Sequence, residues 1–359
     1  TVVIPSTVPG DIVTDLNRAG VVDDPMYGVN WREQSGVWAR ESGWSFTRVF
    51  DFNTVASPSV LLVLDGVKMA ADVYLNGVYL GGLADQHLRY EFEVVSVLRA
   101  TANNLTIHIP LPSHDVRNDE GRYAACSGGW DWAQYSNTFT PGGLPWLSFG
   151  VWKSVYLVEV ATFSMRAMVT HVFYNGAYPT MPLTDATAGG WTVNVTAHVV
   201  AGPKGTPVGG GTFSAAIAGL DVPAATGTLR KFLGPNEPFN ITLSLNVPAG
   251  MVRLWWPNGV AAVRGAKQPL YTISLSYHTK NVGKSKDKAV FVTSKKIGFR
   301  TLAAVTDDDS KPGRIAHLSG SGSLTLRYVV NGASLWIRGS NMIPLDEFAG
   351  RADPEALRL

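Results

Sequence analysis

Short strand-like runs separated by turn signals recur through the first 160 residues and limit what this chain can fold into. The runs lie at Trp44–Phe50, Val60–Asp65, Ala71–Tyr79, Tyr90–Val95, Leu105–Ile109 and Val151–Val160. Within the third run, Asn76-Gly77 is the strongest short-range signal for a β-hairpin. Only one short helix is expected, over Asp11–Ala19, entered after Pro9-Gly10 and closed at Gly20. Many short strands with little helix predict a jelly-roll type of β-sandwich over residues 1–162.

The next block, residues 163–301, has the same character at a smaller scale. Apolar and polar residues alternate in Trp191–Val199, Phe239–Val247 and Leu270–Tyr277, and turns rich in glycine and proline separate these runs. This spacing predicts an immunoglobulin-like sandwich. The fold class expected for the chain is therefore mainly β.

The last residues read differently from the two sandwiches. Residues 302–323 are polar and predict a connector, and a hairpin at Asn331-Gly332 leads into a strand-like run at 334–338. A helix start follows at Asp353-Pro354, where Asp is a favoured N-cap and Pro a favoured first residue. One strand and part of one helix cannot bury their own apolar faces. We therefore expect residues 324–359 to be the truncated start of a βα domain in a longer protein.

Composition excludes several classes of function. The net charge of +2 gives no electrostatic reason to expect nucleic acid as a partner. No run approaches eighteen uninterrupted apolar residues, so the sequence predicts no membrane span. The single cysteine, Cys126, rules out an internal disulfide framework and a cysteine-based zinc site. The histidines show no metal-ligand spacing, and we expect neither a metal nor a cofactor.

A segment at Gly128-Gly129-Trp130-Asp131-Trp132 is the best candidate for a binding site. Aromatic faces contact the C–H faces of sugars, and a carboxylate can accept hydrogen bonds from two adjacent hydroxyl groups. Two indoles beside one carboxylate therefore suit a carbohydrate subsite. The same tripeptide is also compatible with two core tryptophans and an aspartate that caps a turn, and its residues alone favour this second interpretation.

The order of motifs along the chain resembles the β-mannosidases of glycoside hydrolase family 2. The matching segments are Pro9-Gly10 with Asp15-Leu16, Asp24-Pro25-Met26-Tyr27-Gly28, Trp44-Ser45-Phe46, Val73-Tyr74-Leu75-Asn76-Gly77, Trp130-Asp131-Trp132, Gly150-Val151-Trp152, Trp255-Trp256-Pro257-Asn258-Gly259, Gln268-Pro269-Leu270-Tyr271, Ile297-Gly298-Phe299-Arg300 and Gly339-Ser340-Asn341 with Ile343-Pro344. The resemblance implies a jelly roll, an immunoglobulin-like domain and then a (β/α)₈ barrel with its active site at the carboxyl ends of the strands.

The resemblance also implies the chemistry. Family members are retaining glycosidases with two catalytic glutamates, and both lie in the barrel beyond the end of this sequence, so we expect no catalytic residue in the chain. Asn236-Glu237 spells the family's acid/base dipeptide, but it lies in a turn of the second sandwich, and we interpret it as structural. Trp130, Asp131 and Asn341 are the expected substrate-binding residues.

The expected partner is a carbohydrate, a β-mannoside or an oligosaccharide. An endo-β-mannosidase, an exo-β-glucosaminidase and a carbohydrate-binding protein with an inactive barrel remain alternatives. The sequence does not predict an oligomeric state. A lysosomal or extracytoplasmic location is expected only if the protein follows eukaryotic β-mannosidases.

Overall fold

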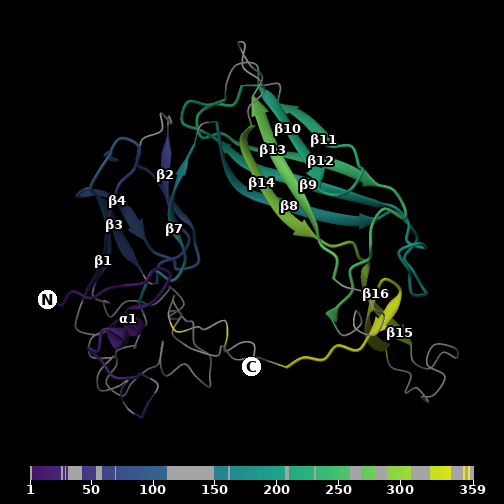
Figure 1. The fold of residues 1–359 in the computed structure, drawn as a ribbon, viewed down its shortest axis with the longest axis horizontal. Helices are drawn as coiled ribbons and strands as arrows, with labels where there is room; N and C mark the ends of the chain where they lie inside the picture. Colours follow the sequence, from purple (N-terminus) through teal and green to yellow (C-terminus); the bar gives the residue numbers. More distant parts are fainter. Residues whose placement is uncertain are drawn as a thin grey trace. The chain divides into compact units, whose positions relative to one another are not determined.

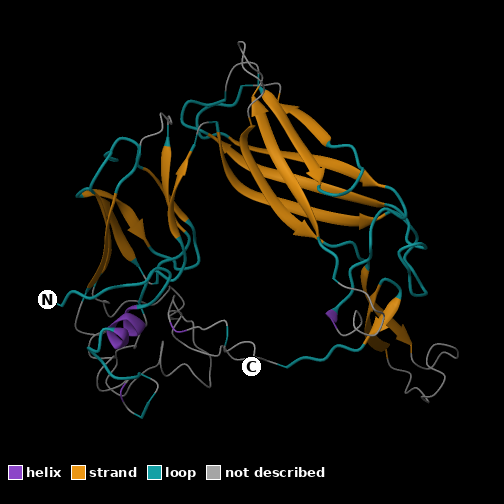
Figure 2. Cartoon of the chain, viewed as in Figure 1, coloured by secondary structure: helices purple, strands orange, loops and turns teal. Residues whose placement is uncertain are grey.

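The structure is a computed structural model of the 359-residue chain. It describes residues 2–25, 27–28, 30, 43–53, 59–68, 70–110, 149–160, 162–206, 210–229, 232–258, 268–279, 289–308, 324–340, 351 and 355. The described chain is mainly β, as Figure 2 shows. It divides into two compact units, one of Thr1–Val160 with Asn341–Leu359 and one of Ala161–Ser340.

The first unit is a sandwich of two antiparallel sheets. One sheet has the order β1-β6-β3-β4, with strands Trp44–Phe50, Asn103–Ile109, Ala71–Leu75 and Val78–Leu83. The other has the order β5-β2-β7, with strands Tyr90–Glu93, Val60–Leu64 and Val155–Glu159. Buried side chains of both sheets, such as Leu64 of β2 and Val73 of β3, form one core. β6 alternates buried and more exposed residues, the pattern of a strand with one face on a core.

Local signals at the start of this unit act as the sequence predicts. Helix α1 spans Ile12–Arg18, and the Asp11 side chain caps it by accepting from the Thr14 N–H at 2.8 Å. Asn76 and Gly77 have φ values of 54° and 81° and join β3 to β4, so the predicted hairpin is confirmed. The segment before α1 is tied to the segment before β7, because Gly10 N–H donates to the Val151 carbonyl and Ile12 N–H to that of Phe149.

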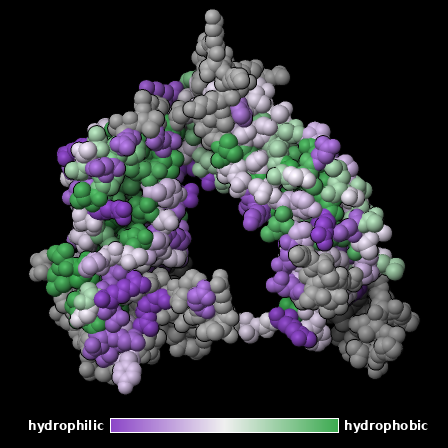
Figure 3. All heavy atoms as spheres, in the orientation of Figure 1, coloured by the Kyte–Doolittle hydropathy of each residue, from purple (hydrophilic) through white to green (hydrophobic). Residues whose placement is uncertain are grey.

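The second unit contains a sandwich drawn in teal and green in Figure 1, and its strands of up to 12 residues correct the expectation of a smaller sandwich. One sheet has the order β12-β9-β8, with strands Pro238–Val247, Trp191–Ala201 and Phe163–Tyr174. The other has the order β11-β10-β13-β14, with strands Ala225–Leu229, Gly211–Ile217, Tyr271–Thr279 and Ala289–Ile297. Odd-numbered residues of β9 are buried from Trp191 to Ala201, and they pack in one core with Phe213 and Tyr277 of the facing sheet. The viewed surface of this sandwich mixes hydrophilic and hydrophobic residues (Figure 3).

A third small sheet corrects two expectations from the sequence. Leu302–Asp308 form a strand, β15, although 302–323 is predicted to be a connector, and β15 pairs with β16 (Leu324–Val330) over its whole length. The run predicted at 334–338 is shorter, because β17 spans only Ala333–Leu335 and pairs back on β16 through the Asn331-Gly332 turn. Beyond β17, Trp336 and Ile337 are 87% and 61% exposed. Alternation alone could not locate β15, since its polar end resembles a loop.

No helix among the described residues is long and apolar enough to span a membrane.

Candidate functional site

The residues that the sequence nominates for sugar binding lie outside the described residues. Trp130 and Asp131 fall in 111–148, and Asn341 falls in 341–350. Their assignment as substrate-binding residues therefore stays a prediction. The expected helix start at Asp353 also lies outside the described residues.

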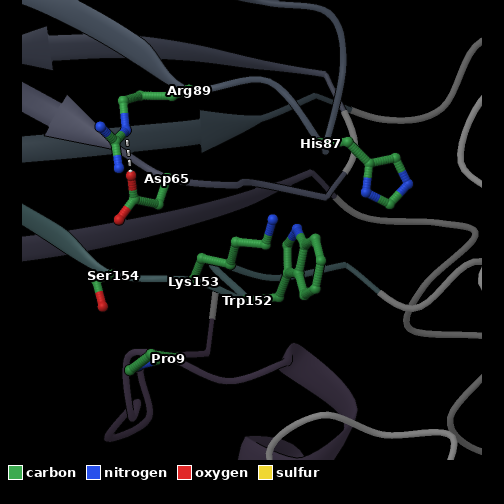
Figure 4. Close-up of a pocket in the computed structure, with 7 residues that line it drawn as sticks. All are labelled: Pro9, Asp65, His87, Arg89, Trp152, Lys153 and Ser154. Carbon is green, nitrogen blue, oxygen red and sulfur yellow. Dashed lines mark hydrogen bonds and ion pairs between the residues drawn. The ribbon is translucent and has the colours of Figure 1, made fainter. Parts of the chain in front are cut away.

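The described part of the first unit contains an open cavity of about 540 Å³, which we call the Trp152 cavity. It is lined by Pro9, Asp65, His87, Arg89, Trp152, Lys153 and Ser154 (Figure 4). Asp65 follows β2, His87 and Arg89 precede β5, and the last three residues precede β7. Because β5, β2 and β7 are neighbours in one sheet, residues distant in sequence meet at one end of that sheet.

One wall of the Trp152 cavity is an ion pair. Arg89 donates from Nε to Oδ1 of Asp65 at 2.7 Å, the contact marked by the dashed line in Figure 4. The Asp65 side chain is 24% exposed, whereas that of Arg89 is 44% exposed. This pair acts on Tyr156 of β7. Partial burial raises the pKa of the Tyr156 phenol, the positive charge of Arg89 opposes that rise, and the nearby Asp65 carboxylate reinforces it.

The opposite wall is the indole of Trp152. Its Nε1–H donates to the Gln86 carbonyl at 3.1 Å, and the His87 ring meets it edge to face with centroids 5.7 Å apart. The Lys153 ammonium lies 4.2 Å from the centre of the same indole, within the range of a cation–π interaction. The backbone of Gly66 packs closely against the indole. A Cβ at this position would come within 2.8 Å of both the Gln86 carbonyl oxygen and Trp152 Nε1. The indole is therefore held in one orientation.

Sequence reasoning did not find this cavity. In the sequence, Trp152 is noted only as part of the Gly150-Val151-Trp152 motif, and the structure shows that it packs and also lines a cavity. No local sequence motif links Asp65, Arg89 and Lys153. They are close together because β2 pairs with both β5 and β7. Only the Trp152-Lys153 dipeptide, an aromatic ring followed by a cation, could have drawn attention to the site.

A second, more apolar groove lies between the two sheets of the same unit. It has a volume of about 570 Å³ and lies against β1, β6, β2 and β7, with Phe46, Leu62 and Ile107 among its apolar residues. Arg48 and Tyr156 are the charged and phenolic residues that line it. Pro9 and Ser154 line both this groove and the Trp152 cavity.

Two motifs of the second unit make contacts within the fold, and one of them, Asn236-Glu237, is the turn that the sequence analysis interprets as structural. The Glu237 carboxylate accepts a hydrogen bond of 2.8 Å from the Gly234 N–H within its own turn, where Asn236 has a φ of 57°. Trp256 is 4% exposed in the core, and Arg300 stacks on Trp255 with its guanidinium carbon 4.4 Å from the ring centre. Neither motif lines the Trp152 cavity or the groove between the two sheets of the first unit.

Comparison with known proteins places this chain in context. Residues 1–153 match the family described as glycosyl hydrolase 2 galactose-binding domain-like. The β-mannosidase of Rattus norvegicus is 25% identical over 384 residues, which cover 99% of this chain and 38% of that protein. β-Mannosidase B of Emericella nidulans is 25% identical over 374 residues, which cover 98% of this chain and 38% of that protein. The chain is similar to the N-terminal portion of glycoside hydrolase family 2 β-mannosidases.

Solved structures show the same fold. The β-D-mannosidase of Dictyoglomus thermophilum matches with a TM-score of 0.69 at 21% identity, over 98% of this chain and 39% of that one. The exo-chitosanase of Amycolatopsis orientalis matches with a TM-score of 0.67 at 19% identity, over 98% of this chain and 35% of that one. The chain spans about 38% of the length of the curated relatives named above.

Proposed function

We propose that the chain is the non-catalytic N-terminal part of a retaining glycoside hydrolase that acts on terminal β-mannosides. The observation that carries the proposal is the match to curated β-mannosidases over 98–99% of this chain. Two sandwiches in the order that the sequence predicts support it. In this proposal the two catalytic glutamates of the retaining mechanism belong to a domain that the chain precedes.

The proposal assigns a type to each domain. Residues 1–162 form a jelly-roll domain and residues 163–301 an immunoglobulin-like domain. The seven strands of the second sandwich, three in one antiparallel sheet and four in the other, support the immunoglobulin-like assignment. Residues 324–359 contribute the first strand and the start of the first helix of a (β/α)₈ barrel, a role that rests on the motif Gly339-Ser340-Asn341.

Within this enzyme the chain contributes part of the sugar subsite. Asp131 accepts hydrogen bonds from hydroxyl groups of the terminal sugar, and Trp130 forms an apolar wall against its C–H face. Asn341, at the end of the first barrel strand, donates or accepts a further hydrogen bond. Residues 1–359 by themselves do not cleave this sugar, since cleavage needs the two glutamates.

An assay with aryl β-mannosides tests the proposal. Residues 1–359 alone should release no phenol, and the longer protein that carries this chain should release it with retention at the anomeric carbon. An aryl β-glucosaminide and an unbranched β-mannan, assayed in parallel, distinguish exo-β-glucosaminidase and endo-β-mannosidase activity. Turnover by residues 1–359 would refute the non-catalytic role, and binding without any turnover by the longer protein would favour a carbohydrate-binding protein with an inactive barrel.

A further inference from the structure

We propose that the Trp152 cavity binds an oligosaccharide through the carboxylate of a uronic acid unit. This inference concerns a site in the first unit that uses neither Trp130, Asp131 nor Asn341. It goes beyond the proposed hydrolase function, because it requires binding only.

The lining of the Trp152 cavity carries more positive than negative charge. Arg89 and Lys153 carry positive charge, and Asp65 is the only carboxylate that lines the cavity. Asp65 pairs with Nε of Arg89 at 2.7 Å, and the two residues together carry no net charge. Among the described residues, Lys153 has no carboxylate partner. Its ammonium group lies against the indole of Trp152. The cavity therefore has an excess of positive charge available to an anionic group of a ligand.

The size and shape of the Trp152 cavity suit one sugar unit. A volume of about 540 Å³ lies within the range of small-molecule sites, roughly 300–1,000 Å³. The cavity is open, so a sugar unit could sit inside it while the units on either side extend into solvent. An indole and an imidazole form one wall, and aromatic rings of this kind contact the apolar faces of sugars.

Two side chains that line the Trp152 cavity are held in place by their neighbours. Trp152 is fixed by its hydrogen bond to the Gln86 carbonyl and by the close approach of Gly66. Arg89 is fixed by Asp65 at 2.7 Å. Side chains that are already ordered lose little conformational entropy when a ligand binds. Ordering of this kind is a property of binding sites more than of solvated surface charges.

The carboxylate of Asp65 decides between a sugar acid and a small inorganic anion. A carboxylate accepts hydrogen bonds at both oxygens, so Asp65 can accept from sugar hydroxyls while it holds Arg89. Ser154 adds a hydroxyl group to the lining of the cavity. A free phosphate has no hydroxyl-rich ring to offer Asp65. A uronic acid satisfies the cations and the acceptor together.

Calorimetric titration of residues 1–359 tests the proposal directly. The probe is an oligosaccharide that contains glucuronic acid, and its matched control is the same oligosaccharide with the carboxylate reduced to an alcohol. We expect the acidic form to bind at least tenfold more tightly, and added salt to weaken its binding. Equal affinity for the two forms would overturn the proposal without any variant. Inorganic phosphate that displaces the acidic oligosaccharide at equal concentration would overturn it as well, because the site would then recognise a bare anion.

Two variants of one residue locate the site. Lys153→Gln removes the charge and should weaken binding of the acidic oligosaccharide at least tenfold, whereas Lys153→Arg keeps the charge and should stay within about threefold. Lys295→Gln makes the same change at an exposed position of β14 and should leave affinity unchanged. Equal losses in Lys153→Gln and Lys295→Gln would overturn the assignment to the Trp152 cavity. None of these measurements depends on hydrolysis, so their failure is distinct from a failure of the proposed function.

Discussion

Asn331 donates a hydrogen bond of 3.0 Å from Nδ2 to the carbonyl oxygen of Trp255, 76 residues earlier in the chain. Its Oδ1 accepts a second bond, of 2.9 Å, from the Thr301 N–H. Asn331 is fully buried and has a φ of 47°, a conformation that asparagine tolerates better than most residues. One side chain thus joins the β16–β17 turn to the core of the second unit.

Replacement of this side chain should destabilise the second unit. Asn331→Ala leaves the Thr301 N–H and the Trp255 carbonyl without their partner, at a cost of about 2–4 kcal/mol for two buried groups. Urea unfolding followed by tryptophan fluorescence measures the loss. Asn331→Gly keeps the backbone conformation and separates that contribution from the hydrogen bonds. A loss below 0.5 kcal/mol, on the order of a neutral surface substitution, would mean that the amide does not anchor the turn.

The first unit should be intolerant of a side chain at Gly150. A Cβ there would lie 2.4 Å from the Gly10 carbonyl oxygen and 2.7 Å from Asp11 Cα, and both are backbone atoms that no rotamer change can move. Gly150→Ala should therefore destabilise the unit by about 1–3 kcal/mol, the usual cost of overpacking. The matched control is Gly339→Ala, because a Cβ at Gly339 meets nothing within 4 Å. Equal melting temperatures for the two variants would contradict the structure.

Stability of the first unit should depend on the ionisation of Asp15. Burial raises the pKa of this carboxyl from 3.8, while hydrogen bonds from Ser6 and Thr7 hold the rise in check and the Asp11 charge adds to it. The folded state therefore binds a proton more tightly than the unfolded state. That contribution to stability is present at low pH and is lost as the pH rises from 3.8 through the folded pKa.

The variant Asp15→Asn tests this dependence. Asparagine keeps an oxygen that can accept from Ser6 but cannot ionise, so the free energy of unfolding should change less with pH above 3.8 than in the parent chain. Urea titrations at a series of pH values make the comparison. If the two profiles are parallel, Asp15 is not the group responsible.

In the proposed β-mannosidase, Asp131 should be essential to hydrolysis. Loss of two charge-assisted hydrogen bonds to the sugar costs about 3–6 kcal/mol of transition-state binding. Asp131→Ala should therefore lower kcat/KM for an aryl β-mannoside at least about a hundredfold, with an unchanged circular dichroism spectrum. Near-normal kinetics would remove Asp131 from the sugar subsite and favour its role as the cap of a turn.

Replacement of Glu237, in contrast to that of Asp131, should leave hydrolysis almost unchanged. Its carboxylate bonds to the Gly234 N–H inside its own turn, and Glu237→Gln retains an oxygen for that bond. The variant should keep kcat/KM within about twofold and stability within about 0.5 kcal/mol, as surface substitutions do. A loss of activity by several orders of magnitude would instead make Glu237 the acid/base.

Motifs that depend on local conformation could be predicted from the sequence. The two Asn-Gly turns adopt positive φ at both residues because these residue types allow it, and α1 begins at the aspartate that can cap it. The strands at Trp44–Phe50 and Trp191–Ala201 follow from their composition or alternation. In β8, by contrast, the residues Met165–Thr170 show no clear alternation in sequence, and pairing with β9 determines that strand.

The sequence by itself determined the mainly β class, the order of the two sandwiches and the resemblance that points to a glycosidase, since all three depend on local patterns along the chain. Only the tertiary structure decided that Leu302–Asp308 is a strand and that Asp65, Arg89 and Lys153 surround one cavity. Pairing between distant strands brings such residues together. Strand pairing depends on partners far along the chain, and no local pattern records which partners meet.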